Sequence, residues 1–273
     1  MKTMNVLSFG AGTQSTAMVL LAIEKRILID LIVFADTGAE TPAVIEHAVK
    51  MQELVKNETN IPFIIAYPKQ GAIENIENYL YGSGTRNVFP FWVKSGLLKR
   101  QCTGDFKIIP IQKAIREYLG IKPGKHFPKK ELHVNMSLGI TTDEIMRAKD
   151  NITKWITNKY PLLELGWDRQ DAIKYCSQHG IKPPRSACFF CPYKNKNEWN
   201  ELSEQEPNLY KKAVEYDNRL REVGTNFKGI REEMYLHKSK CALKEAVDAY
   251  KLQGSLFVDE DFSDLECEGH CFL

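Results

Sequence analysis

The stretch "SFGAGTQSTAM", residues 8–18, decides the fold. It follows a short apolar run at residues 4–7 and leads into a second apolar run that continues to residue 23. A strand, a glycine-rich turn and a helix in this order are typical of an anion site, because the first N–H groups of a helix have no partner within it. Neither a Walker lysine nor the dinucleotide fingerprint follows. The sequence therefore predicts a phosphate-binding loop without a lysine, with an ordinary tight turn as the alternative. The loop residues concerned are Ser8, Phe9, Gly10, Ala11, Gly12, Thr13, Gln14 and Ser15.

Strand and helix patterns alternate outward from this loop. Short apolar runs predict strands at residues 4–9, 28–36, 62–68 and 134–140, and helical spacing predicts helices at residues 15–26, 41–57 and 110–119. Such alternation predicts an α/β fold, with a parallel twisted sheet flanked by helices. Further helical patterns at residues 168–180 and 197–223 predict a helical C-terminal region. We therefore expect an α/β domain at residues 1–157 and a helical, cysteine-bearing region at residues 158–273 packed on it.

Composition places few limits on function. The chain has 273 residues, 43% of them hydrophobic, and a net charge of +2, which is ordinary for a globular protein. No apolar run approaches the roughly 20 residues that span a bilayer, and the N-terminus has no signal-peptide pattern. We therefore expect a cytoplasmic protein without a membrane partner, whose seven cysteines are thiols or metal ligands rather than disulfides.

Charge is unevenly distributed along the chain. Residues 94–130 contain ten basic side chains and two acidic ones, whereas residues 255–273 contain six acids and no Lys or Arg. The basic stretch predicts contact with an anionic substrate, either a phosphorylated small molecule or a nucleic acid. A solvated basic surface is the alternative.

Three segments together resemble the PP-loop ATP pyrophosphatases. "GAGTQS" resembles their loop, Ser-Gly-Gly-x-Asp-Ser, and is close to the variant in proteins similar to phosphoadenosine phosphosulfate (PAPS) reductases, many of them phage-encoded. Gly10 stands where the first Ser is usual, and Gln14 where the Asp is usual. "FADTGAETP" at residues 34–42 is similar to the family segment beside the adenosine, and "GITTDEIMRAK" at residues 139–149 is similar to the one facing the nucleotide.

The resemblance implies a fold of the adenine nucleotide alpha-hydrolase-like type. It also implies that ATP or a related adenine nucleotide binds together with Mg²⁺. Arg147 would be a cation on a phosphate, and Lys107 would bring charge that the loop lacks. The further nucleotide contacts implied are Asp36, Thr37, Gly38, Gly139 and Asp143.

The cysteines suggest a metal site. Cys188 and Cys191 form a C-x2-C pair, and two sulfurs on one loop can share a metal ion. Iron–sulfur adenylylsulfate reductases carry a Cys-Cys pair before a Lys-x-x-Pro segment and a later C-x2-C. This chain resembles them at Cys102, although Gln101 replaces the first cysteine of the pair.

The resemblance thus implies three ligands of a [4Fe–4S] cluster. One iron would then stay open, as in PP-loop tRNA thiolases, or a tail cysteine would complete the set, Cys271 or Cys267. Four thiolates would suit Zn²⁺ equally well.

Three functions follow from these patterns. The first is a PP-loop enzyme that cleaves ATP between the α and β phosphates to adenylate a substrate, with sulfur transfer to a nucleic-acid base as its purpose. The second is a sulfonucleotide reductase, because "ECEGHC" at residues 266–271 is similar to the reductase tail and would make Cys267 the nucleophile. The acids around Cys267 argue against this role, because they raise a thiol's pKa. The third is a nucleotide-binding protein that has lost catalysis. The oligomeric state is not predicted.

Overall fold

The computed structural model describes residues 2–82, 86–224 and 232–253. Its chain forms two compact units that interleave along the sequence. The first unit contains Met1–Lys69 and Thr103–Ser186, and the second contains Gln70–Cys102 and a later segment that begins at Ala187. The division differs from the single cut expected between residues 157 and 158. Residues 161–186 belong with the sheet because their helices pack on it, and residues 70–102 leave the sheet after its third strand.

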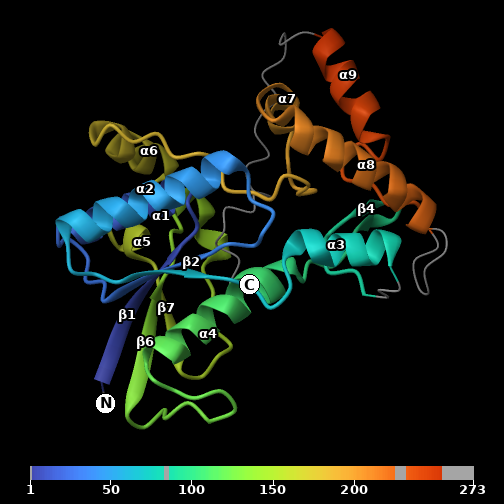
Figure 1. The fold of residues 1–273 in the computed structure, drawn as a ribbon. Helices are drawn as coiled ribbons and strands as arrows, with labels where there is room; N and C mark the ends of the chain where they lie inside the picture. Colours follow the sequence, from blue (N-terminus) through green and yellow to red (C-terminus); the bar gives the residue numbers. More distant parts are fainter. Residues whose placement is uncertain (1, 83–85, 225–231, 254–273) are drawn as a thin grey trace. The chain divides into compact units, whose positions relative to one another are not determined.

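A five-stranded parallel sheet forms the centre of the first unit (Figure 1). The strands lie in the order β3-β2-β1-β6-β7, so the chain moves outward from β1 in one direction and later returns to its other side. The α/β class predicted from the sequence is confirmed. The strands are β1 (Lys2–Phe9), β2 (Leu31–Ala35), β3 (Phe63–Ala66), β6 (Leu132–Ser137) and β7 (Ile156–Lys159).

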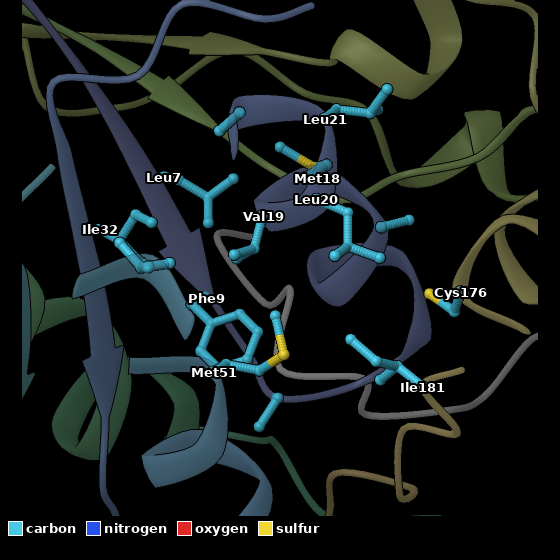
Figure 2. Close-up of a cluster of buried hydrophobic side chains, with 14 of the residues drawn as sticks. Leu7, Phe9, Met18, Val19, Leu20, Leu21, Ile32, Met51, Cys176 and Ile181 are labelled. Atoms are coloured by element: carbon cyan, nitrogen blue, oxygen red, sulfur yellow. The ribbon is translucent and has the colours of Figure 1, made fainter. Parts of the chain in front are cut away.

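Helices cover both faces of this sheet. Leu7 and Phe9 of β1 face a buried cluster that includes helices α1 (Thr13–Ile23), α2 (Pro42–Glu58) and α6 (Arg169–Gln178) (Figure 2). Val6 faces the opposite cluster, which includes α4 (Ile109–Tyr118). Side chains alternate between the two faces of a strand, so a strand buried on both sides reads as the continuous apolar run seen in the sequence. The first unit also contains the π-helix η1 (Gly104–Ile108), the 3₁₀ helix η2 (Thr142–Arg147) and α5 (Pro161–Glu164).

Buried α1 explains why the loop before it is fixed in place. Nine of its eleven residues are buried, including Met18, Val19 and Leu21, because α1 is enclosed by the sheet, α2 and α6. Cys176 of α6 lies in this cluster at 0% exposure, and burial raises the pKa of its thiol to about 12. Cys176 is therefore a packing residue, as its helical position predicts.

Two segments distant in sequence build the second unit. Its elements are α3 (Ala72–Tyr81), β4 (Trp92–Val93), β5 (Gly96–Leu97), α7 (Lys196–Gln205), α8 (Pro207–Gly224) and α9 (Leu243–Gln253). Asp217 of α8 is completely buried, and its carboxylate accepts hydrogen bonds from the backbone N–H groups of Leu236 (2.9 Å) and Leu243 (2.8 Å). Arg221 pairs with the same carboxylate. A buried acid is tolerable here because its charge is compensated by these partners. In the ranges that the structure describes, no helix combines the length and apolar character that crossing a membrane requires.

Replacing Leu21 by Ala tests the α1 cluster. Leu21 is fully buried, so Leu21→Ala should lower the free energy of unfolding by about 2–5 kcal/mol, because a cavity remains. Leu28 is 75% exposed, and Leu28→Ala should change it by less than about 0.5 kcal/mol. Chemical denaturation of both variants measures the difference. Equal effects would contradict the described packing of α1.

His47 makes folding sensitive to acid. Burial lowers the pKa of His47 to about 4, and the ring Nε2 lies 2.8 Å from Thr16 Oγ1 of α1. The unfolded chain takes up a proton near pH 6.5, whereas the folded chain resists it until about pH 4. The contribution of His47 to the free energy of unfolding is therefore fully present above pH 6.5. It is lost as the pH falls towards 4, by at most about 3 kcal/mol.

His47→Gln should remove this part of the pH dependence, measured as the free energy of unfolding between pH 7 and 4. The control is His126→Gln at an exposed position, which should leave the pH dependence as in the wild type. His237, whose pKa burial also lowers to about 4, will still contribute in both variants. An unchanged slope in His47→Gln would refute the assignment.

Candidate functional site

The loop between β1 and α1 is buried and sharply turned. Ala11 has φ = 59°, in the left-handed region that non-glycine residues seldom adopt, and its exposure is 0%. Gly12 caps α1 in an extended conformation. The Ser15 hydroxyl accepts from the Gly12 N–H (3.2 Å) and donates to the Gly12 carbonyl (3.1 Å). The Ser15 hydroxyl thus fixes the backbone of the loop at Gly12. The first turn of α1 follows directly, at the carboxyl edge of the sheet.

Gln14 lies in the first turn of α1 with 0% exposure. Among the described residues, neither its amide nitrogen nor its amide oxygen has a hydrogen-bond partner. Gly139, in the loop after β6, lies directly against it. A Cβ added to Gly139 would lie 3.0 Å from Gln14 Cβ and 3.1 Å from the Ser15 nitrogen. The loops after β1 and β6 therefore meet where the strand order reverses, which is the usual ligand position in open α/β sheets.

Several buried hydroxyls also have no hydrogen-bond partner among the described residues, and two of them lie near the loops discussed here. Ser186 Oγ and Thr141 Oγ1 are buried and have no partner within the described parts of the chain. Ser186 adjoins the helix cap, because a Cβ added to Gly12 would lie 3.8 Å from the Cβ of Ser186. Buried polar groups in native proteins are almost always hydrogen-bonded, so these orphans indicate that a ligand or water completes the site.

The loop after β2 contributes a charged pair. Asp36 accepts from the N–H of Gly38 (2.8 Å), which has φ = 74°, so this carboxylate shapes the turn. Thr37 donates to Glu40 Oε1 (3.2 Å), and Lys107 Nζ lies 3.8 Å from the same oxygen. Lys107 belongs to η1, which directly precedes α4. Helix α4 runs from the carboxyl edge of the sheet to the amino edge, where the parallel strand β6 begins. This topology brings Lys107 to the carboxyl edge.

The residues after β6 form a second ion pair. Arg147 is paired with Glu144 in η2. Burial raises the pKa of Glu144, and the neighbouring Arg147 opposes that rise. Asp143 accepts from the backbone N–H of Arg169 (3.0 Å), so it holds the start of α6. Lys107 and Arg147 are therefore both held by carboxylates of their own unit.

Four lysines of the basic stretch lie at the opposite edge of the sheet. Residues 122–130 precede β6, and the backbone of Lys2 at the start of β1 donates to the Glu131 carbonyl (2.7 Å). These lysines are consequently at the amino edge of the sheet, opposite the β1–α1 loop. They are Lys122, Lys125, Lys129 and Lys130, all exposed.

Three predicted cysteine ligands lie in the second unit. The Cys102 N–H donates to the Val88 carbonyl (2.9 Å), and the Cys191 N–H donates to that of Cys188 (3.0 Å). The Phe89 and Phe190 rings meet edge to face with centroids 5.2 Å apart, so the segment before Cys102 packs against the C-x2-C loop.

The described residues contain no group of three or more His, Cys, Asp or Glu side chains that could hold a metal ion. Cys267 and Cys271 lie outside the described residues. The side chains described therefore do not by themselves fit a cluster or a zinc ion. For Mg²⁺, the nearby acids Asp36, Glu40, Asp143 and Glu144 each use one carboxylate oxygen in the contacts given above, and Glu144 Oε2 is buried without a hydrogen-bond partner among the described residues. Carboxylate oxygens are the ligands that Mg²⁺ prefers.

Sequence patterns did not reveal Ser186, Thr141 or Glu40 as members of this edge. The sequence gives a weak indication for Glu40, because this residue lies in the same segment as Asp36 and Thr37, which were predicted to contact the nucleotide. Ser186 lies far from the β1–α1 loop in the sequence, and no sequence motif links it to that loop. Only the folded chain places Ser186 beside Gly12.

No protein-family model matches the chain, and no curated protein matches it. Among solved structures, it is similar to the U34-tRNA thiolase NcsA from Methanococcus maripaludis with its [4Fe–4S] cluster. The identity is 14% and the TM-score 0.39, over 91% of this chain and 81% of that one. A likeness at this level has no bearing on the reaction.

Gly139→Ala tests the close approach of the two loops. The added Cβ must displace the backbone of Gln14 and Ser15, so we expect a loss of about 1–3 kcal/mol in the free energy of unfolding. Gly104→Ala is the control, because a Cβ there meets nothing within 4 Å. If thermal or chemical unfolding shows both variants to be as stable as wild type, the contact at Gly139 is not tight.

Proposed function

We propose that this chain is a PP-loop enzyme that binds ATP at the β1–α1 loop. It cleaves ATP between the α and β phosphates and transfers the adenylyl group to a substrate. The observation that carries the proposal is the glycine-containing turn that ends β1 and opens α1 where the strand order reverses. A helix N-terminus at this position suits a phosphate, because the first N–H groups of a helix have no partner within it.

The position of the loop supports this assignment. It lies at the reversal of strand order between β1 and β6, and Thr37 and Gly38 follow the neighbouring strand β2 at the same edge. The nucleotide contacts proposed are the loop Ser8–Ser15 with Asp36, Thr37, Gly38, Gly139 and Asp143. Asp36 and Asp143 also support their own turns, because they accept from the backbone N–H groups of Gly38 and Arg169.

Charge for the transition state comes from outside the loop. A nucleophilic atom of the acceptor attacks the α-phosphorus, the bond to the bridging oxygen breaks, and pyrophosphate leaves with the added negative charge. Lys107 and Arg147 are the cations proposed to stabilise it, because preformed donors at developing charge lower the barrier most. Glu40 and Glu144 hold these cations at the edge before the phosphates compete for them.

Sulfur transfer to a nucleic-acid base is the proposed purpose of adenylation. Cys102, Cys188 and Cys191 of the second unit are the candidate sulfur or cluster ligands, and the packing of Phe89 on Phe190 supports their neighbourhood. If a cluster binds, it would supply a site for sulfide. The described residues do not form a group of three such donors, and no step of the adenylation depends on a cluster.

Pyrophosphate release from ATP tests the reaction, measured with cellular RNA, DNA and phosphorylated small molecules as acceptors. Lys107→Ala should lower the rate about 100-fold or more, because a cation is lost at the leaving group. Lys113→Ala is the matched control, since Lys113 lies exposed on α4 and pairs only weakly with Glu117 at 3.8 Å. ATP binding without pyrophosphate release from any acceptor would make this a nucleotide-binding protein and sink the proposed reaction.

A further inference from the structure

We propose that the second unit binds a nucleic-acid strand through its phosphates along one basic face, which we call the hairpin face. This face comprises residues 92–100, which contain the β4–β5 hairpin, together with residues 191–196 and 235–241. The inference rests on the proposed function, because it names the part of the chain that would hold a nucleic-acid acceptor. The three segments contain seven basic side chains and no Asp or Glu, and the basic residues are Lys94, Lys99, Arg100, Lys194, Lys196, Lys238 and Lys240.

Strand β4 joins the three segments into one surface. The backbone of Trp92 exchanges two hydrogen bonds with that of Tyr235 (2.9 and 2.8 Å), and the Lys240 ammonium donates to the Lys94 carbonyl (3.0 Å). Towards the remaining segment, the Trp92 indole N–H donates to the Pro192 carbonyl (2.9 Å). The basic side chains of the hairpin face therefore belong to segments that are bonded to one another, not to independent loops.

Lys194 is a preorganised cation within the hairpin face. Its N–H donates to the Cys191 carbonyl (3.1 Å), which closes the turn after the C-x2-C pair, and only 8% of the residue is exposed. Its ammonium forms no hydrogen bond or ion pair with any residue in the described ranges, yet it is not one of the fully enclosed polar atoms, so it reaches solvent from a buried stem. A cation held in this way, without an internal counter-ion, can bind an anion with little further loss of side-chain entropy.

Arg100 is also held in place by a neighbouring side chain. Its guanidinium carbon lies 5.3 Å from the centroid of the Tyr193 ring, a distance at which a cation and a ring attract each other. A planar guanidinium suits a phosphate, because two of its N–H groups can donate to two phosphate oxygens at once. Lys94 and Lys99 add two exposed ammonium groups on the same hairpin segment.

The distribution of charge favours a chain of phosphates over a single small anion. The cations are spread over three segments, whereas a site for one small anion needs donors that converge on a point. Two acids border the hairpin face, and both are engaged: Glu232 accepts from the Ser95 N–H (2.9 Å), and Glu233 accepts from the Tyr235 hydroxyl (2.5 Å). Positive charge is thus in excess. Because Cys191 lies in this face, a strand bound here would pass beside a candidate sulfur ligand.

Fluorescence anisotropy tests the inference, with labelled oligo(U) and oligo(dT) of about 20 nucleotides titrated with the full chain between about 50 and 200 mM NaCl. Wild type should bind both oligonucleotides, with an affinity that falls steeply as the salt concentration rises. Lys194→Met keeps the buried stem and removes the charge. It should weaken binding about 3-fold or more, and it should lower the slope of log affinity against log salt by about 0.7, the value for one phosphate contact on a single strand.

A triple variant and a charge-matched control sharpen the test. Lys94→Gln, Lys99→Gln and Lys194→Met together should weaken binding about 10-fold or more. The control is Lys122→Gln, Lys125→Gln and Lys129→Met at the amino edge of the first unit, which removes as many charges from exposed positions and should bind as wild type does.

Thermal unfolding checks that both triple variants are folded. If the triple variant is not, Lys94→Gln with Lys99→Gln repeats the comparison at two exposed positions without touching the buried stem of Lys194. This double variant should weaken binding about 5-fold or more.

Three results would overturn the inference: no binding of either oligonucleotide at the lowest salt concentration, equal losses of affinity in the triple variant and its control, or an unchanged salt slope in Lys194→Met. The inference and the proposed reaction can fail separately. Binding that depends on the hairpin face, without pyrophosphate release from ATP, would refute the reaction alone. Pyrophosphate release with RNA as the acceptor, at equal RNA affinity in both triple variants, would refute the inference alone.

Discussion

The contact between Gly139 and the first turn of α1 constrains the whole carboxyl edge of the sheet. A side chain at Gly139 would come within 3.0 Å of Gln14, so the loops after β1 and β6 can approach only because one partner is glycine. Gln14 is fully buried at this contact, and Gly12 of the same loop lies beside Ser186. The first turn of α1 is thus enclosed by chain segments that are far apart in the sequence.

Charge at this edge is separated from the loop that is proposed to bind phosphate. The β1–α1 loop itself is neutral, whereas Lys107 and Arg147 stand on η1 and η2, each against a carboxylate. Such pairs keep cations from being buried alone and fix their positions. The cations of this edge are therefore held in place by partners within the protein.

The sequence predicts the elements of the sheet well but not the way its loops meet. Strands at residues 4–9 and 134–140 are recognisable because buried parallel strands are continuous apolar runs, and their parallel α/β arrangement is confirmed. The turn at Gly10–Gly12 follows from local pattern, and the place of Lys107 before α4 follows from topology. Thr141 lies inside the segment 139–149 that the sequence analysis singled out, but its burial was not predicted. Ser186 could not be predicted, because a single hydroxyl has no periodicity and its burial depends on long-range packing. The exit of the chain after β3 was missed for a similar reason: α3 has an ordinary amphipathic pattern that does not specify the body on which it packs.

The interleaving of the two units has a consequence for synthesis on the ribosome. The sheet lacks β6 and β7 until residues 132–159 are made, and by then residues 70–102 have emerged without the later helices of their own unit. Neither unit can be completed before the other has begun. The order of translation therefore requires an unfinished segment to wait for its partners, and a nascent chain interrupted near residue 160 would expose apolar surface on both bodies at once.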